Sequence, residues 1–378
     1  MPRSLDGEPQ IGHWITVASG TRRVLPISGR SLASLGARGA HGMNETMTDV
    51  AVSIVNTSNC ALLLRCLQTL LDEPDRRCRV DVVLLDNAST DNSLEAVRER
   101  FPQVNVIAQT RRAGFGANHN TVIRETRSRY VYVLNEDTET SPGTLDAMVE
   151  YLDAHPRCAV VGPRIVGPDG RQQGSAWRLM SLPVQALWAL TLGQRGAVIS
   201  TGDRPKVVGA VSACAMLVRR EAFERVGCFD ESYFIFSEEA DSARRLARHG
   251  YEIHYLPTVV TMHHGQQTTS GVPDRQINEH WRSFRLYTER WHRPWEARLL
   301  AWLTGLGYAQ AFVAAQLARR LPAKLRPAAA QAWNPGIYLL HARRAFGGPP
   351  GPGIREAADA FNRRRESAQP PTRAGGSS

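Results

Sequence analysis

The 378-residue sequence lacks any C-x-x-C pair, and its six cysteines are scattered along the chain. A zinc site or a disulfide framework needs closely spaced or regularly paired cysteines, so this pattern argues against both and fits a reducing compartment. Residues 1–45 contain no apolar run typical of a secretory signal peptide. Since 42% of the residues are hydrophobic, a chain of this length can bury a core without disulfides. We therefore expect a globular, cytoplasmic protein.

Two signatures of nucleotide-binding proteins are missing as well. No G-x-G-x-x-G follows the first expected strand, and the loop after it, Asn-Thr-Ser-Asn at 56–59, is neither glycine-rich nor basic. An ordinary dinucleotide-binding domain carries such a glycine-rich loop at this place. A nucleotidyltransferase would also need a glycine-rich, basic phosphate loop there. Both classes are therefore disfavoured.

Positive charge is in excess, since 46 Lys and Arg face 36 Asp and Glu and give a net charge of +10. Such an excess predicts a polyanionic partner, either anionic lipid, a phosphorylated substrate or nucleic acid. The basic clusters, for example 343–344 and 363–365, lie outside the expected core. No strand surface interleaves basic and aromatic residues, so nucleic acid is the least favoured partner. Each cluster by itself also fits a merely solvated surface.

Hydrophobic periodicity alternates between strands and helices in the first half. Strands are expected at 50–55, 80–85, 104–108 and 130–134, and helices at 60–71, 89–101 and 116–126. This alternation predicts an α/β fold with a mostly parallel, doubly wound sheet. In the second half we expect a strand at 159–166, a variable excursion at 171–205, a strand pair at 207–219, short and longer helices at 220–226 and 238–249, and extended segments at 251–255 and 259–264.

Beyond residue 266 the chain becomes helical and basic. Residues 299–318 carry no charge, but a membrane span needs about 20 strongly apolar residues and this stretch includes glycine, threonine and glutamine. An interfacial helix or a packed core helix fits better. The predicted organisation is a disordered extension at 1–47, an α/β domain at 48–270, a helical, membrane-associating region at 271–348 and a flexible tail at 349–378.

Polar side chains follow the expected strands where each strand ends. Asn56, Asp86, Asn135 and Asp137 occupy such positions, and the carboxyl ends of parallel strands are where ligands bind in open α/β sheets. The Asp137 carboxylate can bind Mg²⁺ or Mn²⁺, and the cation can hold a diphosphate. Asp137 and Asp86 can also be turn or helix-capping acids, and both alternatives stay open.

The densest acidic cluster is Glu238, Glu239 and Asp241, followed by Arg245. Helical spacing places Glu238, Asp241 and Arg245 on one face, with Glu239 turned about 100° away. Adjacent acids repel unless a cation, a proton or an arginine compensates. A solvated helix start also favours acids, but the aromatic run at 233–236 indicates that these acids emerge from a packed wall into a cleft.

Taken in order, these motifs resemble those of the family 2 glycosyltransferases of GT-A fold, in particular the bacterial rhamnosyltransferase-like branch. The resemblance covers roughly residues 49–266. It rests on an ordered set of segments: Asn56, DNASTD at 86–91, GFGANHN at 114–120, LNEDT at 134–138, MLVRR at 216–220, VGCFDE at 226–231, EEAD at 238–241 and His263.

The resemblance implies a role for each matching residue. Asp86 contacts the nucleobase or ribose, and Asn56, Asn118, Asn135 and Arg245 join it in binding the donor. Asp137 binds the divalent metal, Mg²⁺ or Mn²⁺, with His263 as a second ligand or diphosphate contact. Glu239 is the catalytic base, where the family usually has aspartate, and Glu238 and Asp241 complete the catalytic cluster.

The activity implied is inverting transfer of a sugar from a nucleoside-diphosphate donor to a lipid-linked or cell-envelope glycan acceptor. The implied enzyme is cytoplasmic and lies peripherally on the anionic inner face of the membrane. The alternative is a catalytically silent scaffold that binds sugar nucleotides.

Overall fold

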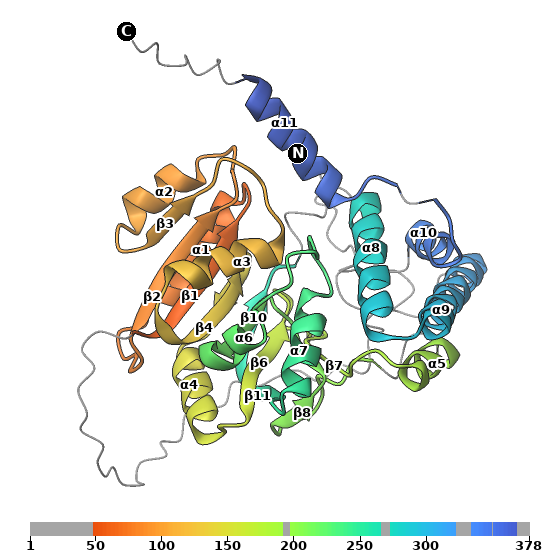
Figure 1. The fold of residues 1–378 in the computed structure, drawn as a ribbon, viewed down its shortest axis with the longest axis horizontal. Helices are drawn as coiled ribbons and strands as arrows, with labels where there is room; N and C mark the ends of the chain where they lie inside the picture. Colours follow the sequence, from red (N-terminus) through yellow and green to blue (C-terminus); the bar gives the residue numbers. More distant parts are fainter. Residues whose placement is uncertain (1–47, 192–196, 266–272, 323–333, 350, 369–378) are drawn as a thin grey trace.

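The computed structural model describes residues 48–191, 197–265, 273–322, 334–349 and 351–368. Within these ranges the strands form one large mixed sheet with neighbours in the order β3-β2-β1-β4-β10-β6-β11-β5, while β8 pairs with β11 (Figure 1). The members are β1 (Thr48–Asn56), β2 (Val80–Asp86), β3 (Asn105–Ala108), β4 (Ser128–Asn135), β5 (Thr138–Thr140), β6 (Cys158–Val166), β8 (Lys206–Val208), β10 (Ala215–Arg219) and β11 (Glu252–His263). A small second sheet pairs β7 (Ala176–Trp177) with β9 (Ala210–Val211).

The four strands of the first half are parallel, as predicted. The second half departs from this pattern because β10 runs antiparallel to both β4 and β6. The start of β10 consequently lies beside the carboxyl end of β4, where the Asn135 backbone N–H donates to the Cys214 carbonyl at 2.8 Å. The reversal brings a segment from the second half of the chain to the ligand-binding edge of the first half.

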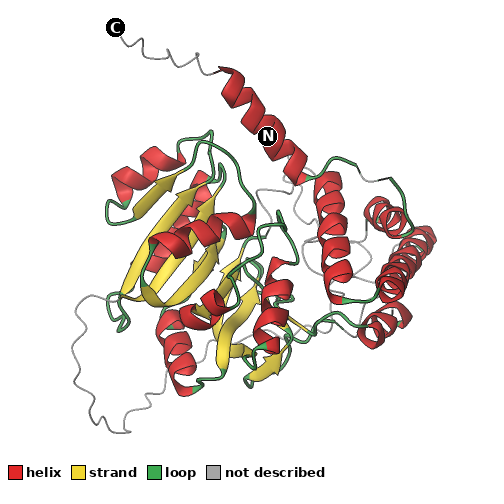
Figure 2. Ribbon diagram, in the orientation of Figure 1, coloured by secondary structure: helices red, strands yellow, loops and turns green. Residues whose placement is uncertain are grey.

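Helices cover both faces of the sheet (Figure 2). Alternate residues of β4 belong to different hydrophobic clusters, with Tyr132 and Leu134 in one and Val131 and Val133 in the other, as the twofold side-chain period of a strand requires. The helices of this domain are α1 (Cys60–Leu71), α2 (Ser93–Arg100), α3 (Phe115–Glu125), α4 (Thr144–Ala154), α6 (Arg220–Arg225) and α7 (Glu238–Arg248).

A helical layer stands beside the sheet domain (Figure 1). It comprises α5 (Leu182–Leu190), α8 (Pro273–Trp291), α9 (Pro294–Arg320) and α10 (Pro335–Ala345). Its own hydrophobic cluster includes Trp188 of α5 together with Trp281, Leu300 and Tyr308. The expected variable excursion at 171–205 thus contributes α5 to this layer. None of the helices in the described ranges is long and apolar enough to cross a membrane.

The expectation of a flexible tail over 349–378 is wrong for its central part, which forms helix α11 (Ile354–Ala368). Glycine and proline at 347–353 suggest a loose segment, but the following fifteen residues are anchored to α8. Arg282 of α8 donates to the Glu356 carboxylate, and Glu279 accepts from the Arg355 backbone N–H at 3.2 Å. The expectations for residues 1–47 and 369–378 concern segments outside the described residues.

Candidate active site

The ends of β1 and β2 bring together the two residues to which the resemblance assigns the nucleoside. Asn56 and Asp86 are register neighbours in this parallel pair, and both side chains are buried. The Asn56 amide donates to Ser89 Oγ at 3.0 Å and to Asp86 Oδ1 at 3.5 Å, and the Ser89 N–H donates to Asp86 Oδ2 at 3.0 Å. Helix α2 begins only at Ser93, so the predicted helix start at Ser89 is wrong and Asp86 organises a loop instead.

The loop before α3 extends this edge of the site. The Asn87 side chain pairs with the backbone of Ala113, accepting from its N–H at 2.8 Å and donating to its carbonyl at 3.3 Å. Asn118 of α3 donates to the same carbonyl at 3.3 Å, while its buried Oδ1 has no hydrogen-bond partner among the described residues. A buried acceptor without a donor is destabilising. Asn118 lies near Asp86, because Asn118 and Asn87, the residue after Asp86, both donate to the Ala113 carbonyl. This position fits the role in binding the sugar donor that is expected for Asn118.

Asp137 and His263 come from opposite halves of the sheet and meet beside the same edge. Asp137 follows β4, and its carbonyl accepts from the backbone N–H of His264 at 2.9 Å. His263 is the last residue of β11 and pairs in register with Thr138. Its Nε2 lies 3.3 Å from Asp137 Oδ1, and both residues are buried. Asn135, the last residue of β4, lies opposite Val55 in the β1–β4 register.

Gln173 fixes the proton on the other ring nitrogen of His263. The Gln173 amide nitrogen donates to the His263 carbonyl at 2.9 Å, so its oxygen is the atom that faces His263 Nδ1 at 3.0 Å. An amide oxygen only accepts, so Nδ1 carries the proton and Nε2 of the neutral ring is an acceptor. Two acceptors, this nitrogen and Asp137 Oδ1, then face each other, which favours a cation or a second proton between them. Such an outer partner that orients a histidine is typical of metal sites.

The Asp137–His263 pair therefore fits a divalent cation, but it is not a complete protein cage. No group of three or more His, Cys, Asp or Glu side chains with metal-binding geometry occurs in the described part of the chain. A hard cation held by one or two protein side chains takes its other ligands from substrate phosphates and water. The arrangement suits a metal that binds together with a diphosphate.

A strained turn aims the acidic cluster. Phe236 and Ser237 have φ angles of 72° and 70°, a left-handed conformation that costs a non-glycine residue about 1–3 kcal/mol and is often stored at functional sites. Helix α7 begins immediately after them with Glu238 and Glu239. The Ser283 hydroxyl of α8 supports the turn by donating at 2.8 Å to the carbonyl that precedes Phe236.

The first two acids of α7 have no counter-charge among the described residues. The Oε2 atoms of Glu238 and Glu239 are both buried without a hydrogen-bond partner among the described residues. Burial raises the pKa of Glu239 to about 7. Burial and the neighbouring Glu239 charge raise the pKa of Glu238 well above its usual value. Near neutral pH, Glu239 therefore exchanges a proton, as a general base must, while the raised pKa of Glu238 favours its neutral form.

Asp241 and Arg245 have a structural role in this geometry. Asp241 is fully buried and accepts at 2.8 Å from both Arg245 Nε and the Trp291 indole N–H of α8. The Arg245 guanidinium also donates to the carbonyls of Val226 and Cys228. The N–H groups of Arg245 thus bond other parts of the protein, which argues against the contact with the sugar nucleotide that was expected for Arg245. The one-face arrangement predicted for Asp241 and Arg245 is present, but it joins α7 to α8.

Cys214, just before β10, connects the two halves of the site. Burial raises the pKa of its thiol to about 12, and the negative charges of Asp137 and Glu239 add to this increase. Both carboxylates therefore lie within electrostatic range of one thiol.

Sequence reasoning missed Gln173, Trp291 and the Asn87 clamp. Gln173 lies in the excursion after a turn, and no spacing links it to His263.

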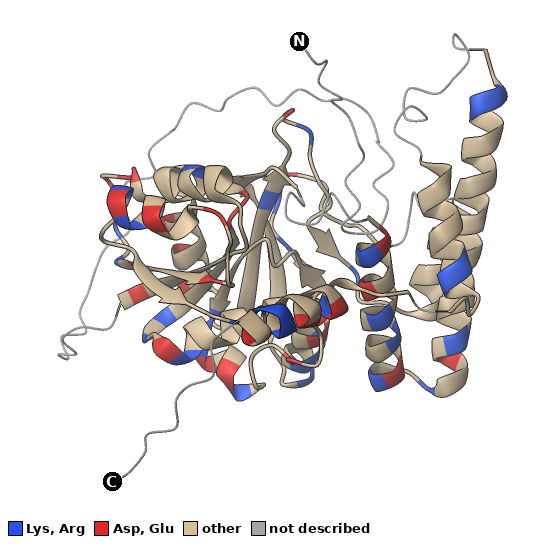
Figure 3. Ribbon diagram, turned by 90° about the horizontal axis from the view of Figure 1, so that it is seen from above, with Lys and Arg blue, Asp and Glu red and all other residues tan. Residues whose placement is uncertain are grey.

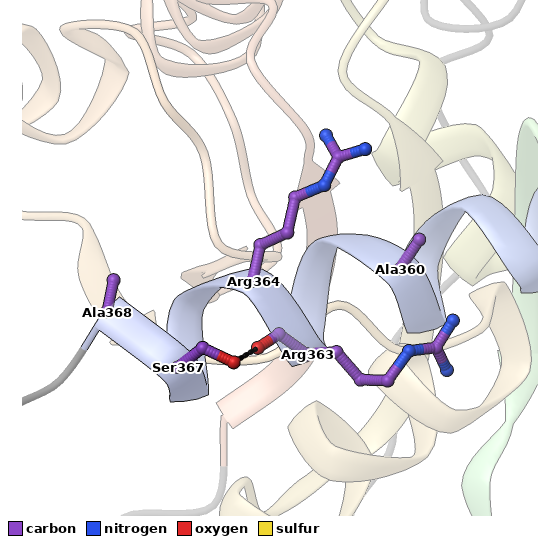
Figure 4. A pocket seen from close by; sticks show the side chains of 5 residues that line it. All are labelled: Ala360, Arg363, Arg364, Ser367 and Ala368. Atoms are coloured by element: carbon purple, nitrogen blue, oxygen red, sulfur yellow. Dashed lines mark hydrogen bonds between the residues drawn. The ribbon is translucent and has the colours of Figure 1, made fainter.

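A hollow on α11 is lined by Ala360, Arg363, Arg364, Ser367 and Ala368 (Figure 4). None of these five residues belongs to the predicted site, so this hollow has no part in the chemistry above.

Residues 49–227 match the family described as Glycosyl transferase family 2. The chain is a glycosyltransferase. It is similar to rhamnosyltransferases: over 281 residues it is 29% identical to the N-acetylglucosaminyl-diphospho-decaprenol L-rhamnosyltransferase of Mycobacterium tuberculosis, covering 69% of this chain and 89% of that protein. It is also 33% identical over 95 residues to the rhamnosyltransferase WbbL of Escherichia coli, covering 25% of this chain and 31% of that one.

The fold of this glycosyltransferase resembles that of a solved mannosyltransferase, PcManGT from Pyrobaculum calidifontis in complex with GDP-Man and Mn²⁺. The TM-score is 0.53 at 19% identity, and the match covers 80% of this chain and 88% of that one. The GT-A fold expected from the motifs is therefore confirmed, together with the helical C-terminal region.

Two acids of α7 should have opposite effects on stability. Glu239 has a folded-state pKa of about 7 against an ordinary 4.5, so ionisation destabilises the fold increasingly above pH 4.5 and fully above pH 7. Glu239→Gln should raise the free energy of unfolding at pH 8 by about 3 kcal/mol and leave it unchanged near pH 4. Asp241→Asn should lower it at pH 8 by about 3 kcal/mol, because it breaks a buried ion pair. Urea unfolding measures the free energy of unfolding of both variants. If both substitutions change it in the same direction at pH 8, the roles given to Glu239 and Asp241 are contradicted.

Proposed function

We propose that this glycosyltransferase transfers a sugar, with rhamnose as the first candidate, from a nucleoside-diphosphate donor to a lipid-linked saccharide, with inversion at the anomeric carbon. The Mycobacterium tuberculosis relative, by its name, transfers L-rhamnose to N-acetylglucosaminyl-diphospho-decaprenol. The observation that supports the mechanism is the Glu239 carboxylate, whose Oε2 is buried without a hydrogen-bond partner among the described residues and which lies within electrostatic range of the same thiol as Asp137.

Glu239 is the proposed general base. The acceptor hydroxyl attacks the anomeric carbon on the face opposite the diphosphate while Glu239 takes its proton, and the bond from the anomeric carbon to the phosphate oxygen breaks. The nucleoside diphosphate leaves with the bonding electron pair, and one displacement inverts the configuration. The raised pKa of Glu238 beside Glu239 favours its neutral form, which limits the negative charge at this point. A divalent cation held by Asp137 and His263 would stabilise the charge on the leaving diphosphate.

Replacing the base should abolish turnover without abolishing donor binding. Glu239→Gln is expected to lower kcat by about 10²-fold or more and to leave the affinity for nucleoside diphosphate within about twofold, because the volume barely changes. In the wild type, kcat/KM should rise between pH 6 and pH 8, since Glu239 must lose the proton that burial stabilises. Rates come from donor consumption with a lipid-linked N-acetylglucosamine acceptor.

The matched control is Glu221→Gln, an exposed acid of α6 that pairs with Arg225, and it should retain wild-type rates. A Glu239→Gln variant with more than about a tenth of the wild-type rate would remove Glu239 from this role. If the wild type binds donor but never turns it over, the silent scaffold is the better description.

Metal and donor should bind together. Asp137 and His263 do not form a complete protein cage for a metal. Mn²⁺ and nucleoside diphosphate should therefore each raise the binding affinity of the other by the same factor. Calorimetry of nucleoside diphosphate with Mn²⁺ or with a chelator measures that factor, which we expect to be at least tenfold in the wild type and near one in Asp137→Asn. Asp169→Asn, at an exposed acid in a turn, is the control. Equal wild-type affinity with metal and with chelator would refute the role of Asp137.

We further propose that an exposed face of α9 binds the anionic membrane surface. Trp295, Leu299, Trp302, Val313 and Leu317 are between 38% and 57% exposed, and helical spacing puts all five on one stripe. The helices of this layer stand apart from the sheet and carry basic residues at their ends (Figure 3). Basic residues near anionic lipid contribute about 1 kcal/mol each. An apolar face bordered by arginines is typical of interfacial helices, and it would place the enzyme beside a lipid-linked acceptor.

Flotation with vesicles tests this surface. The wild type should float with phosphatidylglycerol-containing vesicles at low salt and less at high salt, because salt screens the arginines. The double variant Trp295→Ser and Trp302→Ser should lose most of the bound fraction. Val207→Ser, an exposed valine of β8 outside the helical layer, is the control and should float normally. If the tryptophan double variant floats as well as Val207→Ser, the proposal that α9 binds the membrane is contradicted.

A further inference from the structure

Helix α11 contacts the loop that precedes α3, although almost 250 residues separate them in sequence. The buried Asn362 side chain pairs with the backbone of Arg112: it accepts from the Arg112 N–H at 2.7 Å and donates to the Arg112 carbonyl at 3.0 Å. The adjacent Phe361 lies under the Arg112 guanidinium, whose central carbon is 3.9 Å from the ring centroid. This distance is well within the range of a cation–π contact.

The loop is therefore held from both sides by the same kind of contact. Asn87, which directly follows β2, pairs with the backbone of Ala113, and Asn362 pairs with the backbone of Arg112. An asparagine amide that bonds both backbone groups of one residue fixes the orientation of that peptide. Two such clamps on consecutive residues fix the direction in which the Arg112 side chain leaves the loop.

The loop that carries Arg112 lies beside the nucleoside edge of the site, because Asn87, the residue after Asp86, bonds the backbone of Ala113. The Arg112 Nε is buried and has no hydrogen-bond partner among the described residues. Burial lowers the pKa of the guanidinium, and the negative charge of Asp86 opposes this change. A partly buried cation with an unused Nε donor, within electrostatic range of Asp86, is suited to an anionic, planar ligand, because guanidinium both stacks and donates to phosphate.

The base of α11 also contacts the loop that leads to the acids. Arg355 donates to the Ser232 carbonyl at 2.7 Å and lies 5.7 Å from the centre of the Phe234 ring. The Phe234 carbonyl in turn accepts from the Phe115 N–H of α3 at 2.7 Å. A β-carbon at Gly114 would come within 2.6 Å of that carbonyl oxygen, so these segments are packed backbone to backbone. Helix α11 thus spans the donor loop and the loop before α7.

We propose that α11 is part of the donor site, and that Asn362 and Phe361 act as positioning residues for Arg112, which binds the nucleoside diphosphate of the sugar donor. The inference rests on the proposed function for the identity of that ligand. Donor binding and α11 docking are then linked, so that each strengthens the other.

Calorimetry with the full-length chain tests this positioning. UDP, GDP and dTDP are each titrated with Mn²⁺, and the tightest binder is then used throughout. Asn362→Ala, Phe361→Leu and Arg112→Ala should each weaken binding about tenfold and raise the KM for donor, while the acceptor KM stays unchanged. Ser367→Ala is the control, since this exposed residue of α11 donates to the Arg363 carbonyl of its own helix (Figure 4).

A double-mutant cycle separates positioning from general stability. If Asn362 acts through Arg112, Asn362→Ala should have little further effect on binding in the Arg112→Ala background. Arg112→Lys serves as a second variant, because it leaves the α11 packing residues in place while losing the planar group, and it should also weaken binding. Amide hydrogen exchange of α11 should slow when the nucleotide is added to the wild type.

Three results would overturn the inference: Asn362→Ala binding like the wild type, strictly additive effects in the cycle, or α11 exchange that ignores the nucleotide. A wild type that binds none of the three nucleotides would overturn the proposed function, and the inference with it. A wild type that binds normally while Asn362→Ala and Arg112→Lys also bind normally overturns the inference alone.

Discussion

Uncompensated burial of carboxylates at the start of α7 is the constraint on which the active site depends. A buried carboxylate normally pairs with a cation or takes a proton. Asp241 follows the first course, with Arg245 and Trp291 as partners. Glu238 and Glu239 have no such partner among the described residues, and their pKa values rise. Three acids within four residues thus differ in chemistry because of what surrounds them.

The helical layer maintains that difference. Helix α8 supplies Trp291 and Arg290 to Asp241 and supports the strained turn before Glu238 through Ser283. It also anchors the base of α11 through Glu279, which is fully buried. The region that resembles no family 2 motif is therefore a structural support of the catalytic domain. A strained turn persists only where surrounding contacts determine it, and α8 provides several of them.

The sequence predicts the sheet edge well because strand ends are local features. Asn56, Asp86 and Asn135 each terminate an apolar run, and the parallel register brings them to one edge. Other features depend on long-range contacts that no local pattern records. The antiparallel direction of β10, the contact of Gln173 with His263 and the docking of α11 on Arg112 all join distant segments. The prediction of a flexible tail is wrong for the same reason, because α11 is stabilised by tertiary contacts.

Spacing alone also could not separate the roles of residues on α7. Asp241 and Arg245 share a face, which fits either a ligand site or an ion pair, and only their contacts distinguish the two. Glu239 is turned away from that face and keeps its uncompensated carboxylate.

One helix therefore carries an acid that stabilises the fold and an acid that destabilises it, barely more than half a turn apart. The Asp241 network fixes the axis of α7 against α8, so the first turn cannot shift to relieve the buried Glu239. A base with a pKa near 7 requires this arrangement, because a carboxylate free to move into water would return to its ordinary pKa. The stability contributed by Asp241 is thus what would allow the protein to retain the proposed base, Glu239.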